Sequence, residues 1–217
     1  MDFAAARKTM VESQVRTNDV TDLRIQAAFE TIPREKFLPE GLRAQAYVER
    51  ELPYAPGRRL LTARDFSKLV AAADPRPGDL ILDVACGPGY STAVLAALSE
   101  MVLGVEADER LAQGAQDNLN LVGVSNAAVI VGSLEKGAPG QGPFDLVFIG
   151  GAIAVEPAHL FVQVKEGGRL AAILRKDGVS RGVVWRCDHG VTAARVAFDA
   201  TAGAILPGFE APKTFVF

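Results

Sequence analysis

The feature that most constrains the fold is the segment over residues 80–91, which reads LILDVACGPGYS. An apolar run that suits a buried strand leads directly into a glycine-rich turn, and a helix-forming run follows the turn. This order of strand, glycine turn and helix lets the backbone approach a nucleotide-like ligand closely. Ligands of open α/β sheets lie beyond the carboxyl ends of the strands, which is where this turn lies. The segment therefore predicts an α/β fold with a ligand site at the turn.

After this segment, short apolar strands alternate with helices along the chain. The expected parallel strands cover residues 80–85, 102–105, 128–131, 144–149 and 169–174, with helices over 91–98 and 109–121. Continuous apolar strands separated by helices predict a mostly parallel sheet with helices on both faces. Residues 183–187 and 191–198 flank an Asp-His-Gly turn, which predicts a C-terminal antiparallel hairpin at one edge of the sheet.

The amino-terminal part of the chain has a helical pattern instead. Apolar positions at helical spacing predict helices over residues 3–15 and 23–32, and Pro33 ends the second one. Residues 39–61 contain several prolines and no alternating strand pattern, so we expect an irregular stretch there. The chain is thus predicted to form one domain, with an N-terminal helical cap over 1–75 and the α/β core over 76–217.

Composition excludes several classes of protein. Hydrophobic residues make up 49% of the chain and charged residues 23%, which excludes general disorder. The net charge of -3 argues against nucleic acid as the main partner. The apolar runs are too short for a membrane span, the amino terminus has no apolar signal core, and the two cysteines supply no zinc spacing. We expect a cytoplasmic protein with no membrane, nucleic-acid or metal partner, and slightly favour a monomer.

Two carboxylates near the turn indicate the kind of ligand. Glu106 ends the next strand, and a carboxylate there can accept both hydroxyl hydrogens of a ribose. Such a site fits an adenosine-containing cofactor, either a nicotinamide or a sulfonium compound. Asp83, inside the strand before the turn, suits a positive amino group and would repel a pyrophosphate. Ala85 and Thr92 take the outer positions of the G-x-G-x-x-G spacing, so S-adenosylmethionine is favoured over a dinucleotide.

Residues 83–90 resemble motif I of class I S-adenosylmethionine-dependent methyltransferases. Further segments resemble the protein-L-isoaspartate O-methyltransferase family and cover most of the chain: residues 32–39, 46–47, 52–53, 93–96, 143–145 and 167–170. The resemblance implies a Rossmann-like class I methyltransferase fold, with an S-adenosylmethionine-binding core and a substrate loop in the cap. It also implies methyl transfer to a carboxylate, either on an isoaspartyl residue of a damaged protein or peptide or on a related small acid.

The resemblance also implies which residues contact the cofactor. These are Asp83, Ala85, Cys86, Gly87, Gly89, Tyr90, Glu106, Ala107, Ser133 and Leu134. By this likeness Cys86 and the two glycines line the methionine end, Glu106 holds the ribose, and residues 132–134 flank the adenine. Ser133 stands where the family has an acidic residue.

The substrate loop departs from the family pattern. The family typically reads L-P-I-G-x-G-Q-T-I-S-Q-P, whereas this chain reads LPYAPGRRLLTA over residues 52–63. Leu61 stands in place of the serine that is credited with a catalytic role, and Thr62 is the nearest hydroxyl. Arg58 and Arg59 replace Gln-Thr and could neutralise an acidic acceptor through paired hydrogen bonds. Thr62, Arg58 and Arg59 are therefore the candidate catalytic residues.

The remaining residues leave two other functions open. A carboxylate acceptor has a pKa of roughly 4 and requires no general base, which suits a chain whose two histidines, His159 and His189, lie in no catalytic motif. One alternative is a degenerate methyltransferase fold that binds cofactor or a partner without transfer, because Leu61 replaces the serine. A NAD-dependent oxidoreductase would use the same turn, but Asp83 and the incomplete glycine spacing disfavour it.

Overall fold

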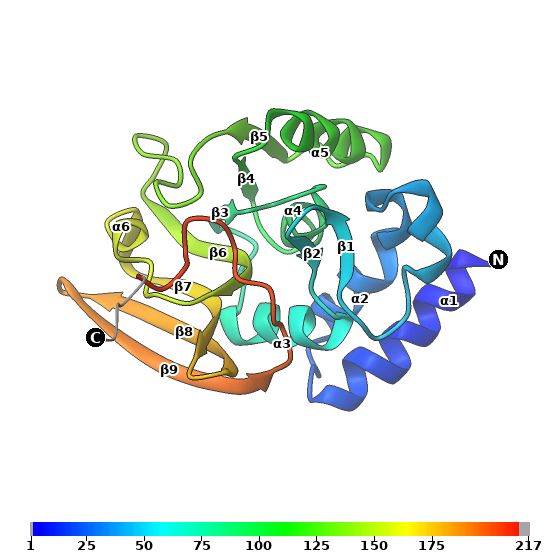
Figure 1. The fold of residues 1–217 in the computed structure, drawn as a ribbon, viewed down its shortest axis with the longest axis horizontal. Coiled ribbons are helices and arrows are strands. Elements are labelled where there is room, and N and C mark those ends of the chain that lie inside the picture. The colour runs from blue at the N-terminus through cyan, green and yellow to red at the C-terminus, as the bar shows by residue number, and fades with distance from the viewer. Residues whose placement is uncertain (1, 213–217) are drawn as a thin grey trace, which may run out of the picture.

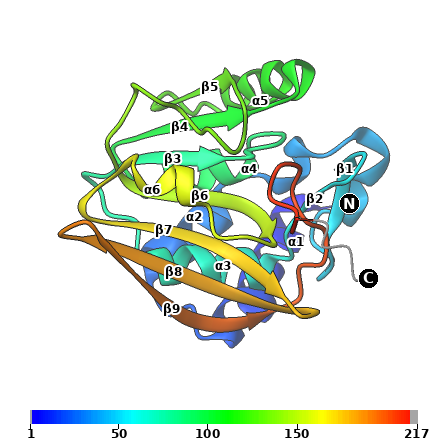
Figure 2. The ribbon, with the colours of Figure 1, turned by 60° about the vertical axis from the view of Figure 1, so that its left-hand side comes forward.

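The computed structural model describes residues 2–212, and a seven-stranded sheet forms its centre (Figures 1 and 2). The strands lie in the order β5-β4-β3-β6-β7-β8-β9. Their bounds are β3 Leu80–Val84, β4 Met101–Glu106, β5 Ala127–Val131, β6 Phe144–Ile153, β7 Val164–Lys176, β8 Val179–Asp188 and β9 Val191–Ala200. The first five strands of this order pair in parallel, and β8 and β9 add an antiparallel hairpin at the β7 edge. The predicted sheet and its edge hairpin are confirmed.

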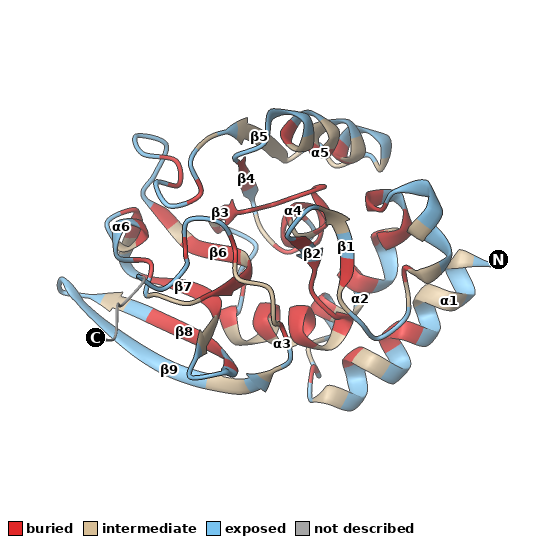
Figure 3. Ribbon diagram, viewed as in Figure 1, coloured by how far each residue is buried: buried red, intermediate tan, exposed pale blue. Residues whose placement is uncertain are grey.

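Both faces of the sheet are covered, as continuous apolar strands require. Successive residues of a strand point to opposite faces, so Ile81 and Leu82 belong to two separate buried clusters. The helices α3 (Ala63–Ala73), α4 (Tyr90–Ala96) and α5 (Glu109–Leu121) contribute to the first cluster. The short α6 (Ala158–Phe161) and the returning C-terminal segment, with Leu206 and Phe209, contribute to the second. Buried residues therefore line the inner strands of the sheet on both sides, whereas the outer strands β5 and β9 have none (Figure 3).

The amino-terminal cap packs on the face of the sheet that α3, α4 and α5 cover. Helix α1 (Phe3–Met10) continues as a π-helical turn over Val11–Val15, and α2 (Leu23–Thr31) follows. Aromatic rings join cap to core, with centroids 5.6 Å apart for Phe37 and Tyr90 and 5.5 Å apart for Phe66 and Tyr90. Cap and core thus share one buried cluster. The single-domain organisation and its boundary at residue 75 stay predictions.

One expectation about the cap was wrong. Residues 39–61 contain a two-stranded antiparallel hairpin, formed by β1 (Leu52–Ala55) and β2 (Arg58–Leu60). The strands have only four and three residues, too few to show the alternating pattern that marks a strand. The Pro-Gly pair between them was the available signal, and Gly57 has the positive φ of 69° that such a turn favours. This hairpin lies beside α4 and carries both arginines of the predicted substrate loop (Figure 1).

The longest helix of the described residues, α5, has 13 residues. No helix within residues 2–212 is both long and apolar enough to cross a bilayer.

Candidate functional site

The turn after β3 has the backbone geometry of a close-approach site. Ala85, Gly87 and Gly89 all have positive φ, at 62°, 55° and 93°. The Gly89 N–H donates to the Cys86 carbonyl at 3.0 Å, which closes the turn. A Cβ built on Gly87 would lie 2.5 Å from the hydroxyl oxygen of Tyr54 on the hairpin. Glycine is therefore favoured at position 87, and Tyr54 covers the turn from the cap side.

Glu106 ends β4 with a fully buried side chain. The backbone N–H groups of Gly87 and Ala107 each donate to its carboxylate at 2.9 Å, and that of Asp108 donates at 3.3 Å. The Arg58 guanidinium donates to both carboxylate oxygens, at 2.8 Å and 2.6 Å. A bidentate pair of this kind compensates a buried charge. Glu106, which is predicted to hold the ribose, thus lies at the turn, and in this structure it binds Arg58.

Asp83, in β3, is also fully buried beside the turn. Its Oδ2 accepts hydrogen bonds from the hydroxyls of Ser91 and Thr92, each at 2.7 Å. Its Oδ1 is buried and has no hydrogen-bond partner. Burial raises the pKa of Asp83 to about 7, although the two hydroxyls oppose the shift. An unsatisfied acceptor of this kind suits an additional donor, such as the amino group of the predicted cofactor.

Cys86 lies in the turn but is not an activated nucleophile. Its side chain is buried, and burial raises the pKa of the thiol well above its ordinary value. The thiolate is the reactive form of cysteine, so this environment keeps Cys86 unreactive. Cys86 is thus a small packed residue of the turn, and its contact with the cofactor stays a prediction.

The segment predicted to flank the adenine lies at the same edge of the sheet. The Gly132 N–H donates to the main-chain carbonyl of Glu106 at 2.9 Å, which joins the ends of β4 and β5. Leu134 is buried, whereas Ser133 and Ala107 are exposed. These three residues are thus brought close to Glu106, and their contact with a cofactor stays a prediction.

The three candidate catalytic residues do not come together in this structure. Arg58 points inward to Glu106, whereas Arg59, the next residue along β2, is exposed. Thr62 caps α3, because its hydroxyl oxygen accepts the Asp65 N–H at 3.0 Å. Its hydroxyl is therefore engaged in holding the helix end. The catalytic roles of Thr62, Arg58 and Arg59 stay predictions.

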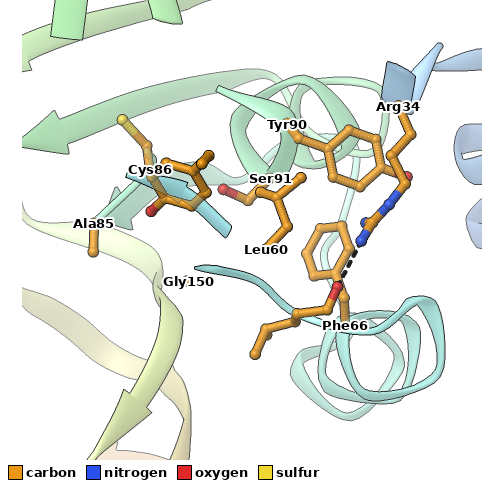
Figure 4. Close-up of a pocket in the computed structure, with 10 residues that line it drawn as sticks. Arg34, Leu60, Phe66, Ala85, Cys86, Tyr90, Ser91 and Gly150 are labelled. Atoms are coloured by element: carbon orange, nitrogen blue, oxygen red, sulfur yellow. Dashed lines mark hydrogen bonds between the residues drawn. The ribbon is translucent and has the colours of Figure 1, made fainter. Parts of the chain in front are cut away.

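A small cavity lies between the turn, the hairpin and α3 (Figure 4). Its volume is about 20 Å³, which is room for about one water molecule. The lining residues that Figure 4 labels are Arg34, Leu60, Phe66, Ala85, Cys86, Tyr90, Ser91 and Gly150. Tyr54 and Leu61 complete the lining. The hairpin therefore closes the space directly above the glycine turn.

Arg34 is a site residue that sequence reasoning did not single out. Its side chain is buried and lies over the Tyr90 ring, 4.9 Å from the ring centroid. It donates to the carbonyls of Ala46 at 2.9 Å and Leu61 at 2.7 Å. Arg34 thereby fixes the backbone of the residue that replaces the family serine. The signal available in the sequence was its place within residues 32–39, one of the segments that resemble the family.

A family model described as protein-L-isoaspartate(D-aspartate) O-methyltransferase matches residues 5–184 of the chain. Among curated relatives, a protein-L-isoaspartate O-methyltransferase from Koribacter versatilis is 34% identical over 168 residues, which is 77% of this chain and 76% of the relative. One of the same name from Methanoculleus marisnigri is 34% identical over 166 residues, covering 76% of each chain.

Solved structures agree in fold. A structure of a protein-L-isoaspartate O-methyltransferase superposes with a TM-score of 0.80 at 19% identity, covering 94% of this chain and 67% of its own. A Plasmodium falciparum protein assigned to the same enzymes, solved in complex with S-adenosyl-L-homocysteine, gives 0.79 at 18% identity. That likeness covers 92% of this chain and 98% of the other. These two comparisons concern the fold of the whole sheet and cap.

Proposed function

The chain belongs to the protein-L-isoaspartate(D-aspartate) O-methyltransferase family, and from that premise we propose that its acceptor is the free carboxylate of an isoaspartyl residue in a damaged protein or peptide. The protein is an S-adenosylmethionine-dependent O-methyltransferase. Membership of this family also decides between the two adenosine-containing cofactors weighed from the sequence, in favour of S-adenosylmethionine over a nicotinamide dinucleotide. The proposal concerns the acceptor and the role of each residue at the site.

The residues around the turn fit the cofactor. Glu106 offers a carboxylate for the ribose hydroxyls, and the unsatisfied Oδ1 of Asp83 offers an acceptor for the amino group. Gly87 leaves the turn without a Cβ on the side that Tyr54 covers. When bound, S-adenosylmethionine supplies an electrophilic methyl group on a sulfonium sulfur. The convergence of Asp83 and Glu106 on one glycine turn is the observation that carries the proposal.

The chain's own part in the reaction is to orient the acceptor and exclude water. An isoaspartyl carboxylate has a pKa of roughly 4, so it is ionised at neutral pH and needs no general base. The two histidines fit this picture, because both are exposed, His159 on α6 and His189 in the β8–β9 turn. Apolar side chains from Leu60, Leu61 and Phe66 form part of the wall of the space above the turn, which limits the access of water to it.

Methyl transfer to a defined peptide tests the acceptor. The natural chain is incubated with S-adenosylmethionine labelled in the methyl group and a peptide that contains one isoaspartyl residue. The matched control is the same peptide with an ordinary aspartyl residue. We expect a base-labile methyl ester on the isoaspartyl peptide alone. Equal labelling of both peptides, or of neither while S-adenosylhomocysteine still binds, would contradict the isoaspartyl assignment and favour a different acid.

Three finer expectations belong with this proposal. We propose that the enzyme acts as a monomer, that it has no nucleic-acid partner, and that it works in the cytoplasm. The net charge of -3 supports the second. The first and the third stay predictions from the sequence.

A further inference from the structure

The carboxylate of Glu106 has no acceptor position to spare in this structure. Each carboxylate oxygen offers about two lone-pair positions. Oε2 accepts from the Gly87 N–H and from Arg58 Nη2, and Oε1 accepts from the N–H groups of Ala107 and Asp108 and from Arg58 Nη1. The three backbone donors belong to the turn and to the end of β4, and they are fixed by the fold. Ribose hydroxyls can therefore reach this carboxylate only where Arg58 now binds.

The hairpin places Arg58 there through several contacts. The guanidinium lies 5.6 Å from the centroid of the Tyr54 ring, and Nη2 lies 3.4 Å from the Ala85 carbonyl oxygen. The Tyr54 side chain in turn rests against Gly87. The hairpin β1–β2 thus covers the glycine turn with Tyr54 and fills the position expected for the ribose with Arg58.

The closed arrangement is also incompletely satisfied. Arg58 Nε is buried without a hydrogen-bond partner, as is Asp83 Oδ1. Buried unsatisfied polar atoms cost free energy. The arrangement with Arg58 bound to Glu106 is therefore less stable than one in which a ligand or water satisfies these two atoms. The hairpin β1–β2 is a separate two-stranded sheet that does not pair with the seven-stranded one, so its displacement would break no strand pairing of the central sheet.

Resting on the proposed function, we propose that Arg58 competes with the ribose hydroxyls of the cofactor for the Glu106 carboxylate. Cofactor binding then requires the hairpin β1–β2 to withdraw Arg58 from Glu106. The observed dissociation constant for the cofactor equals the intrinsic dissociation constant divided by the fraction of molecules in which Glu106 is free. Arg58 therefore sets cofactor affinity from inside the site, and removing it raises the affinity.

Calorimetric titration with S-adenosylhomocysteine tests the competition without relying on turnover. The variants are Arg58→Ala and Arg58→Gln, with Arg50→Ala as the matched control. Arg50 has the same charge and lies two residues before β1, but its side chain is exposed, donates to Gln45 and forms no ion pair among residues 2–212. We expect both Arg58 variants to bind about 10- to 100-fold more tightly than the natural chain, and Arg50→Ala to bind within about twofold of it.

A second background separates competition from a general effect of the substitution. With Glu106→Gln already in place, Arg58→Ala should no longer tighten binding, because the carboxylate that the two groups share is gone. Thermal unfolding of the cofactor-free variants checks that each is folded, and Arg58→Gln serves if Arg58→Ala is not. Arg58→Gln removes the charge and keeps most of the side-chain volume.

The outcomes are distinct. Unchanged or weaker binding by a folded Arg58 variant overturns the competition, because a merely structural arginine lowers stability without raising affinity. Equal tightening by Arg50→Ala also overturns it, since the effect would then be one of net charge. If neither the natural chain nor any variant binds S-adenosylhomocysteine, the proposed function itself fails. Binding by the natural chain without tightening in the variants leaves that function standing and removes this inference alone.

Discussion

Arg58 and Glu106, 48 residues apart in the chain, form a bidentate ion pair inside the predicted cofactor site. The pair joins the cap hairpin to the carboxyl end of β4. It therefore links the substrate loop to the end of the sheet where the cofactor is predicted to bind. Arginine stands here where the family loop has glutamine. A neutral amide at this position would leave the carboxylate charge uncompensated by the hairpin, whereas the guanidinium binds it with both donors.

The first prediction concerns the contact between Tyr54 and Gly87. Gly87→Ala should lower the free energy of unfolding by about 2–3 kcal/mol, because the new Cβ meets both an unfavourable φ and the Tyr54 ring. The control is Gly57→Ala, which has a φ of 69° but no atom near the added Cβ, and should cost only about 1 kcal/mol. Urea unfolding measures both. Equal losses would show that Tyr54 does not pack on the turn.

A second prediction follows from the buried carboxyl of Asp83. Its pKa is about 7 in the folded protein and 3.8 in a solvated chain. The folded state therefore binds more protons than the unfolded state between about pH 4 and pH 7, and Asp83 lowers stability progressively as pH rises through that window. Asp83→Asn removes this term. Its gain in unfolding free energy over the natural chain should grow by about 2 kcal/mol between about pH 5 and pH 7.

Urea unfolding at the two pH values measures that difference, and contributions from groups that both proteins contain cancel. A difference that does not change with pH would show that the Asp83 carboxyl titrates normally.

The third prediction concerns Leu61, which replaces the family serine. Leucine cannot form a hydrogen bond, and one lost transition-state hydrogen bond can cost roughly 10²–10³ in rate. Leu61→Ser should therefore raise kcat/KM for an isoaspartyl peptide about tenfold or more, while burial of the new hydroxyl lowers stability. Leu60→Ser is the matched control, because Leu60 is buried beside it and lines the same cavity. Labelled-methyl transfer measures both, and transfer by the natural chain as fast as by Leu61→Ser would show that the missing serine hydroxyl does not limit the reaction.

The fourth prediction is an order of binding. If the cofactor displaces Arg58 from Glu106, the freed guanidinium becomes available to an acidic acceptor above the turn. S-adenosylhomocysteine should then raise the affinity for an isoaspartyl peptide at least about fivefold, and the peptide should raise the affinity for S-adenosylhomocysteine by the same factor. Peptide titrations with and without S-adenosylhomocysteine measure the coupling. Coupling of the same size in Arg58→Ala would assign it to another residue.

The sequence by itself determined the central sheet and the edge at which the site lies. The strands around Asp83 and Glu106 are continuous apolar runs, and the helix over Glu109–Leu121 has the predicted bounds. These features follow from local preferences: apolar periodicity, a glycine turn that requires positive φ, and an Asp at the start of α5 that caps it. The parallel order then brings the ends of β3 and β4 together, because crossover connections leave few alternatives.

Only the tertiary structure decided which side chains cover the glycine turn at the carboxyl ends of the strands. The sequence placed Arg58 in a substrate loop, but its partner is set by how the cap folds back over the sheet. The same is true of Arg34, which is buried through contacts with Ala46 and Leu61, and of Tyr54, which covers Gly87. Each contact joins segments that no local pattern relates, since strand and helix periodicity describe only neighbours in the chain. A hairpin too short to show its own periodicity takes its position from the surfaces it covers.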